Sequence, residues 1–115
     1  MTTTLYGIPN CDTVKKARTR LAAGGHDHLF HDYKKAGVDS ARLDDWIARV
    51  GWEVLLNRAG TTFRALDPAD KADLDAHKAA RLMVAHPSLI KRPVVEHGDA
   101  LLVGFKPAEW DAAGL

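Results

Sequence analysis

The only cysteine in this sequence, Cys11, is the residue best suited to covalent chemistry. It lies in the stretch YGIPNCDTVKKA, residues 6–17, after a short apolar run and before a helical pattern. One cysteine cannot form an internal disulfide, and it cannot complete a zinc site at any familiar spacing. Two interpretations stay open for such a residue: a reactive thiol, or a small buried apolar side chain.

The position of Cys11 at the start of a helix favours the reactive interpretation. Unpaired N–H groups and the positive end of the helix dipole favour thiolate over thiol, and such loops also bind anions. Asp12 opposes this effect unless its carboxylate caps the helix or turns away. Cationic side chains from other loops could compensate, although most Lys and Arg only face solvent. The candidates are Arg58, Arg64, Lys91, Arg92 and Lys106.

Three histidines, His26, His28 and His31, have a spacing that could suggest a metal site. On a strand, His26 and His28 would share one face while His31 would lie on the other. No third ligand for the shared face follows in the sequence. We therefore expect no metal ion at these residues.

Length and composition are typical of one soluble globular domain. The chain has 115 residues, of which 46% are hydrophobic and 27% charged, and 16 Lys and Arg balance 15 Asp and Glu. This balance gives no indication of a nucleic-acid or membrane partner. The segment MTTTLYGIPN has the pattern of neither a signal peptide nor a membrane anchor, so we expect a cytoplasmic protein. We also expect a monomer.

Two predicted strands flank the helix that begins near Cys11. Residues 3–6 form the first strand, and residues 29–33 the second. The helix between them ends at Gly24-Gly25 and has an apolar stripe. A strand, a helix and a strand in this order predict a βαβ unit with parallel strands. The stripe consists of Val14, Ala17, Leu21 and Ala22.

The middle of the chain is predicted to be helical. Ser40 is a plausible N-cap for a helix that Gly51 closes, and Asp67-Pro68 signals the start of a further helical stretch. After it, residues 94–96 and 100–103 predict an antiparallel hairpin, and a short helix follows Pro107. The predicted fold is α/β, a four-stranded mixed sheet with a helical insertion at roughly residues 38–86 within a single domain, residues 1–115.

Four separated blocks of the sequence resemble the thioredoxin-fold arsenate reductase family. They are YGIPNCDTVKKAR, FHDYKKAG, GWEVLLNRAGTTFR, and IKRPVV followed by GFKPAEW. Within this ArsC-like family the chain is most similar to the branch often called YffB-like, and the Spx regulators are relatives. The resemblance covers nearly the whole chain. It implies a thioredoxin-like fold with an inserted helical subdomain.

The resemblance also implies roles for individual residues. Cys11 matches the nucleophilic cysteine, and Arg92 matches an arginine that helps to bind the oxyanion or thiol substrate. The bond between Arg92 and Pro93 would be cis, an isomer found in only about 5–6% of X-Pro bonds in folded proteins. The residues assigned to substrate or glutathione binding are Asn10, Arg58, Arg92, Pro93 and Lys106.

The chain departs from the family's patterns at four positions. Gly7 stands where arsenate reductases proper have a histidine, and Val14 stands where Spx regulators have the second cysteine of C-x-x-C. Lys106 replaces a late arginine and keeps its charge, but lacks the planar fork that grips two oxygens. Arg58 lies one residue later than the family's middle arginine.

These features predict a glutathione-dependent thiol-disulfide reductase with one nucleophilic cysteine. Because the chain has no second cysteine, glutathione or a glutaredoxin must supply the thiol that releases the product. We expect glutathione as co-substrate and no bound cofactor. Two alternatives stay open: a glutaredoxin-coupled arsenate reductase, and a non-catalytic, Spx-like protein that binds a transcription complex.

Overall fold

The computed structural model describes residues 2–115, and its contacts divide the chain into two compact units. The first unit contains the residues up to Ala36 and Arg92–Leu115, and the second contains Gly37–Lys91. The sequence placed a helical insertion at residues 38–86, within the range of the second unit. That the whole chain forms a single domain stays a prediction.

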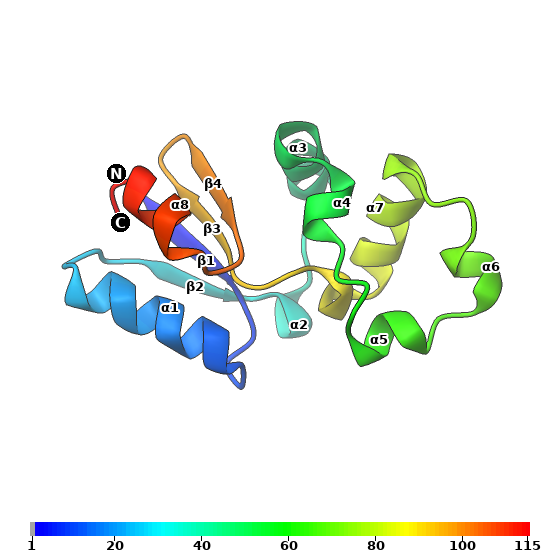
Figure 1. Ribbon diagram of the computed structural model, residues 1–115, viewed down its shortest axis with the longest axis horizontal. Helices are drawn as coiled ribbons and strands as arrows, with labels where there is room; N and C mark the ends of the chain where they lie inside the picture. The colour runs from blue at the N-terminus through cyan, green and yellow to red at the C-terminus, as the bar shows by residue number, and fades with distance from the viewer. Residues whose placement is uncertain (1) are drawn as a thin grey trace. The chain divides into compact units, whose positions relative to one another are not determined.

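The first unit is built on a four-stranded mixed sheet, as the sequence predicted (Figure 1). Its strands have the order β2-β1-β3-β4, with β1 parallel to β2 and the other two pairings antiparallel. The strands are β1, Thr3–Gly7; β2, Leu29–Asp32; β3, Val94–His97; and β4, Ala100–Val103. The helices of this unit are α1, Asp12–Ala23; α2, Tyr33–Ala36; and α8, Pro107–Ala112.

The strand register brings four chain segments to one end of the sheet. Gly7 pairs with Asp32, so the parallel strands β1 and β2 finish together. Tyr6 pairs with Val94, which in turn pairs with Val103, so β3 begins and β4 finishes at the same place. We call this the Cys11 end of the sheet, because the loop from Gly7 to α1 leaves from it. The opposite end, where Thr3 pairs with His97, is the His97 end.

One face of α1 packs into the core of the first unit. Val14, Ala17 and Leu21 are buried as predicted, whereas Ala22, assigned to the same stripe, is exposed. The spacing from 14 to 17 and 21 follows one side of the helix, and Ala22 is one residue past it. The buried cluster consists of Leu5, Val14, Ala17, Leu21, Val95, Leu102 and Trp110.

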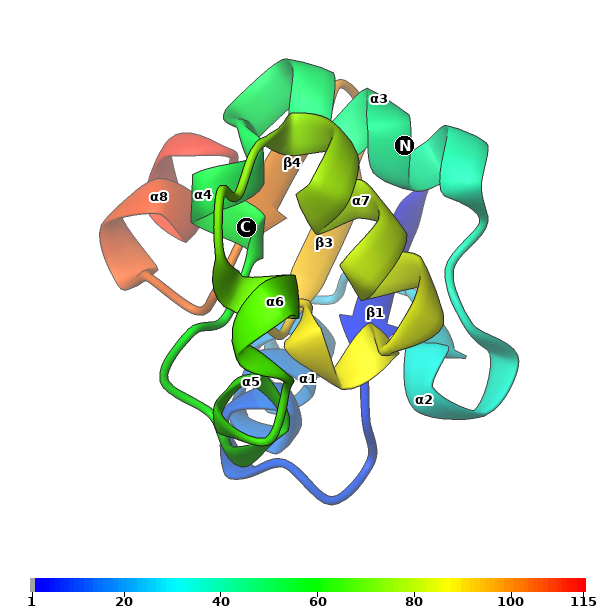
Figure 2. The same ribbon diagram turned by 90° about the vertical axis from the view of Figure 1, so that its right-hand side faces the viewer.

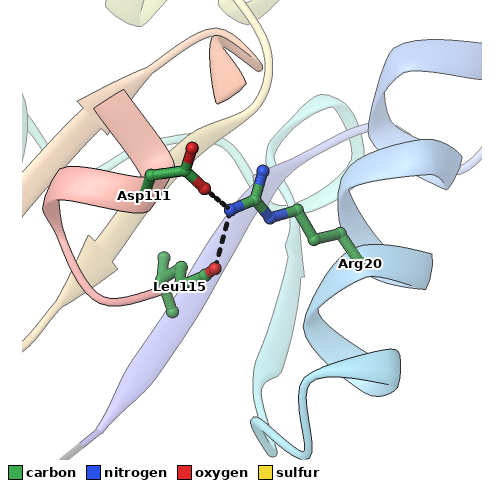
Figure 3. Close-up of polar contacts among 3 residues, drawn as sticks. All are labelled: Arg20, Asp111 and Leu115. Carbon is green, nitrogen blue, oxygen red and sulfur yellow. Dashed lines mark hydrogen bonds and ion pairs between the residues drawn. The ribbon is translucent and has the colours of Figure 1, made fainter. Parts of the chain in front are cut away.

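A polar contact on the surface joins α1 to the last helix, α8. Figure 3 shows the Arg20 guanidinium between Asp111 and Leu115. Its Nη2 atom donates to Asp111 Oδ1 at 2.6 Å and to the Leu115 carbonyl oxygen at 2.7 Å. The guanidinium also lies 5.6 Å from the centre of the buried Trp110 ring. These contacts fix the C-terminal helix beside α1.

The second unit is helical, as predicted (Figure 2). Its core contains the fully buried Leu43 and Trp46 of α3 and Met83 of α7. Within residues 2–115, no helix combines the length and apolar character needed to cross a membrane. The helices are α3, Ser40–Val50; α4, Trp52–Leu55; α5, Thr61–Arg64; α6, Pro68–Lys71; and α7, Ala76–Ala85, followed by a 3-10 turn, Pro87–Leu89.

Two helix boundaries in this unit differ from the sequence prediction. The N-cap of α3 is Asp39 rather than Ser40, because the Asp39 carboxylate accepts the N–H of Arg42 at 3.2 Å. The helical stretch predicted after Pro68 is interrupted: α6 ends at Lys71, and Asp73 has a φ of 52°. A non-glycine residue in the left-handed region cannot continue a right-handed helix.

The end of strand β2, close to the candidate site, also differs from the sequence prediction. The second strand was predicted to reach Tyr33, but β2 ends at Asp32 and Tyr33 is the first residue of α2. Asp32 Oδ1 accepts the N–H groups of Lys34 at 3.1 Å and Lys35 at 3.2 Å. These hydrogen bonds stabilise a turn after Asp32, so the backbone does not continue as a β-strand. Tyr33 therefore turns inward directly after the sheet ends, and its side chain is fully buried.

Candidate active site

Cys11 is the N-cap residue of α1. Its backbone is extended, with φ −119° and ψ 123°, and its carbonyl oxygen accepts the N–H of Lys15 at 2.9 Å. The N–H groups of the following helical turn have no partner within the helix, so they contribute positive potential close to the residue. Cys11 itself is partly buried and packs against the core cluster of the first unit. The sequence prediction of a cysteine at a helix start is confirmed.

The guanidinium of Arg92 provides the positive charge beside this cysteine. Its side chain hydrogen-bonds to both Cys11 and Tyr33. Burial disfavours the charged guanidinium, but the hydrogen bonds and charges of Tyr33 and Cys11 outweigh this effect and raise the pKa of Arg92. Arg92 is therefore a cation beside Cys11, although the two residues are 81 positions apart in the sequence.

The peptide bond between Arg92 and Pro93 is cis, as the family resemblance implied. Pro93 is buried, and its carbonyl oxygen accepts the N–H of Gly104 at 2.8 Å. This hydrogen bond connects the segment that contains Arg92 to the residue that follows β4. Arg92 is thus held by the sheet, and not by a loop alone.

Tyr33 is the site residue that the sequence analysis missed. Its hydroxyl accepts a hydrogen bond from Arg92, since a guanidinium can only donate. Burial raises the pKa of Tyr33, Arg92 lowers it, and the charges of Cys11 and Asp32 raise it further, with a net rise. Tyr33 therefore stays a neutral phenol at neutral pH. Its place directly after β2, within the matching block FHDYKKAG, was the available signal.

Gly7 and Val14, two departures from the family's patterns, are in direct contact. A Cβ atom built on Gly7 would lie 2.8 Å from Val14 Cγ2 and 3.4 Å from Val14 Cγ1. Real Cβ atoms do not approach another carbon so closely, and both residues are buried. Any side chain at position 7 therefore requires Val14 to move, so the two departures form one packed pair below the Cys11 loop.

The other predicted site residues lie in different surroundings. Asn10 is exposed in the loop before Cys11. Lys106 follows β4 at the Cys11 end of the sheet, but its ammonium pairs with Glu109 at 3.5 Å and its side chain is 68% exposed. Arg58 belongs to the second unit, where its guanidinium lies 5.1 Å from the centre of the Trp52 ring. Of the predicted cations, only Arg92 is placed against Cys11 by its contacts.

The three histidines considered as metal ligands have separate partners. The His26 ring meets His97 at 5.7 Å, His28 Nε2 lies 3.2 Å from Arg18 Nε, and the His31 ring lies 5.0 Å from Tyr6. In the part of the chain that the structure describes, residues 2–115, no group of three or more His, Cys, Asp or Glu could hold a metal ion.

Cys11, Arg92 and Tyr33 together form the candidate site. The Arg92 guanidinium and the start of α1 both lie beside Cys11. Tyr33 also hydrogen-bonds to this guanidinium. A four-stranded mixed sheet with a cysteine at the start of the first helix and a cis-proline before the third strand defines the class: this is a thioredoxin-like α/β fold.

Comparison with known families agrees with this class. The ArsC family model matches residues 6–113, nearly the whole chain, and the chain belongs to the ArsC family. This confirms the resemblance identified in the sequence.

Solved structures of high similarity have the same fold. The YFFB (PA3664) protein is 58% identical, with a TM-score of 0.94 over 97% of this chain and 98% of that chain. An arsenate reductase (ArsC) related protein from Brucella melitensis is 54% identical, with a TM-score of 0.76 over 97% of this chain and 93% of that chain.

Sequence relatives come from several bacteria. A protein of Haemophilus influenzae is 43% identical over 110 residues, 96% of both chains. The global transcriptional regulator Spx of Streptococcus mutans is 26% identical over 112 residues, 92% of this chain and 78% of the regulator. The family and its arsenate reductase-related members indicate a thiol reductase family, and hence an oxidoreductase.

Proposed function

We propose that this protein is a glutathione-dependent thiol-disulfide reductase in which Cys11 is the one nucleophilic cysteine and an external thiol releases the product. The observation that carries the proposal is the hydrogen bond from the Arg92 guanidinium to Cys11 at the start of α1. A cation that touches the sulfur stabilises the thiolate, which is the nucleophilic form of cysteine. Tyr33 holds the guanidinium in place, and the core contacts of Cys11 fix the other side of the site.

The reaction would proceed by two exchange steps. The Cys11 thiolate attacks one sulfur of a disulfide R–S–S–R, so that a Cys11–S–S–R bond forms, the original S–S bond breaks and a thiolate RS⁻ leaves. A second thiol, glutathione or a glutaredoxin, then attacks the mixed disulfide and releases Cys11. The chain holds one cysteine, so this second thiol must come from another molecule.

Intact-protein mass spectrometry after incubation with oxidised glutathione tests the proposal. We expect a single glutathione adduct on Cys11 that added thiol removes. The Cys11→Ser variant is the matched control, since it keeps the shape of the side chain and removes the sulfur. Failure of the wild-type protein to form the adduct would overturn the proposal.

Wild-type protein and Cys11→Ser also distinguish the two alternative functions from the proposed one. Arsenate-dependent turnover with glutathione and a glutaredoxin, in the absence of any reaction with disulfides, would favour an arsenate reductase. The relationship to the Spx regulator raises a non-catalytic alternative. Recovery of RNA polymerase subunits with both wild-type protein and Cys11→Ser, without any adduct on the former, would favour that reading.

A further inference from the structure

A small cavity lies beside the loop that carries Cys11. Its volume is about 280 Å³, and it is lined by Ile8, Pro9, Asn10, Asp32, Lys34 and Lys35. All six residues belong to the first unit. The loop after β1 forms one wall and the start of α2 the other, so the cavity occupies the space beyond the carboxyl ends of two parallel strands. Ligands in open α/β sheets commonly bind at such ends.

The charges in this cavity favour an anion. Lys34 and Lys35 are exposed residues on its wall, and each adds an ammonium group. The single carboxylate, Asp32, uses Oδ1 to accept the N–H groups of both lysines, which fixes it as the cap of α2. The three charges sum to +1. Ile8 and Pro9 provide an apolar surface on the opposite wall.

The cavity begins one residue away from the reacting groups. Asn10 directly precedes Cys11, and Asp32 directly precedes Tyr33, which contacts the Arg92 guanidinium. Consecutive Cα atoms are about 3.8 Å apart, so the backbone of the cavity wall lies within one residue's length of the backbone of Cys11 and of Tyr33. Pockets that enclose a whole drug-sized ligand measure about 300–1,000 Å³, so this cavity suits one arm of a ligand.

We propose that this cavity is a subsite for the carboxylate arm of a small thiol or its disulfide, with Lys34 and Lys35 as the residues that bind the carboxylate. The proposal rests on the proposed function, because the ligand's sulfur must meet Cys11. The ligand enters as the disulfide R–S–S–R, Cys11 forms a new bond to one sulfur, and the other half leaves as RS⁻ and takes a proton from solvent. The subsite selects which R group is retained.

The test compares two disulfides that differ in the charge of their carboxyl groups. The rate of adduct formation at Cys11 is measured by mass spectrometry with oxidised glutathione and with its ethyl ester, in which the carboxylates are neutralised. We expect wild-type protein to react about 3- to 30-fold faster with the acid than with the ester, the range for two partly exposed ion pairs. The Lys34→Gln/Lys35→Gln variant should lose this preference and react with the ester at the wild-type rate.

A matched variant separates the subsite from general charge effects. Lys15→Gln/Lys16→Gln removes the same net charge from exposed residues of α1 that do not line this cavity. We expect it to keep most of the preference for the acid. Equal losses in the two double variants would overturn the subsite while the proposed function stands, as would a wild-type protein that reacts equally fast with acid and ester.

Binding of an unreactive analogue tests the subsite without any exchange chemistry. S-methylglutathione carries both carboxylates and no free thiol. We expect it to shift the backbone amide NMR signals of Lys34 and Lys35, and its ethyl ester to leave them in place. Absence of these shifts in the wild-type protein would overturn the subsite. Shifts without any adduct from oxidised glutathione would retain the subsite and reject the proposed reaction.

Discussion

The two ends of the sheet in the first unit both contain polar groups in a largely apolar setting, but they use them differently. At the His97 end, Thr3 Oγ1 and His97 Nδ1 are joined by a 2.6 Å hydrogen bond between cross-strand partners. Thr3 is 3% exposed and His97 8%. At the Cys11 end, the charged Arg92 contacts a cysteine that is only partly buried. Two neutral groups hydrogen-bond to each other at one end, and a cation lies beside a partly buried cysteine at the other.

The polar groups at one end of the sheet contribute to stability, whereas those at the other end are placed for a reaction. A buried neutral hydrogen bond contributes to the free energy of folding and offers nothing to a ligand. A guanidinium beside a partly accessible thiol can stabilise charge that develops during a reaction. Substitutions at the Cys11 end should therefore change the rate of adduct formation, and substitutions at the His97 end should change stability alone.

The largest expected effect comes from Cys11→Ser. A serine hydroxyl keeps the size of the side chain and cannot form a disulfide, so the reaction with oxidised glutathione should fall to background. The midpoint of urea unfolding should stay close to that of the wild-type protein. Mass spectrometry and urea unfolding measure the two quantities. A persistent adduct on the variant would show that the chemistry lies elsewhere.

Arg92→Met should lower the rate of adduct formation about 10- to 100-fold, the usual worth of a hydrogen bond to a charged group. Arg92→Lys should lie between this variant and the wild type, because the ammonium keeps the charge but cannot grip Cys11 and Tyr33 in one planar fork. The rates are measured with the same disulfide at one pH. Equal rates for the Met variant and wild type would contradict the role given to Arg92.

Gly7→Ala should lower the free energy of unfolding by about 1–3 kcal/mol, because its Cβ would lie within 2.8 Å of Val14 Cγ2. In a Val14→Ala background the added cost of Gly7→Ala should be smaller. A double-mutant cycle from urea unfolding gives the coupling between the two positions. Strictly additive losses would show that Gly7 and Val14 do not restrict each other.

Tyr33→Phe should reduce the rate of adduct formation about 2- to 10-fold, because only the hydroxyl that accepts from Arg92 is lost while the buried ring remains. Tyr33 acts through Arg92, so in an Arg92→Met background its removal should have little further effect on the rate. Full additivity of the two substitutions would instead indicate separate roles.

The smallest effect is a pH dependence of stability at the His97 end. Burial, followed by the charge of His26, lowers the pKa of His97 below its usual 6.5. The unfolded chain then binds the proton more tightly than the folded one, so the free energy of unfolding should fall as the pH drops below about 6.5. Urea unfolding at about pH 8 and about pH 5.5 measures this loss. His97→Gln should remove part of it and leave the reaction of Cys11 at about pH 8 unchanged; an undiminished pH dependence would reject the assignment.

Much of the fold could be predicted from local patterns. The strand before Cys11, the helix after it and the hairpin near the C-terminus each have a distinct periodicity and turn residues, and their order defined the mixed sheet. Tyr33 was not predicted as a site residue, because its β-propensity made it look like the last residue of the strand. The capping bonds of Asp32 end that strand instead, and they depend on side-chain geometry that propensity does not describe.

The cations of the site were harder to assign than its cysteine. Cys11 had a local signal, whereas Arg92 meets it through the pairing of β1 with β3, and that register is set by contacts distant in sequence. The family resemblance supplied Arg92 and its cis bond to Pro93. It also suggested Arg58, which the structure places over Trp52 in the second unit, where a cation–π contact occupies its guanidinium.

The role of Arg92 beside Cys11 can be measured as the rate of glutathione adduct formation in wild-type protein, Arg92→Met and His97→Gln. All three proteins are treated with oxidised glutathione at one pH and followed by intact-protein mass spectrometry. We expect a rapid single adduct in wild-type protein and in His97→Gln, and a rate about 10- to 100-fold lower in Arg92→Met. Equal rates in all three, or no adduct on wild-type Cys11, would contradict this expectation.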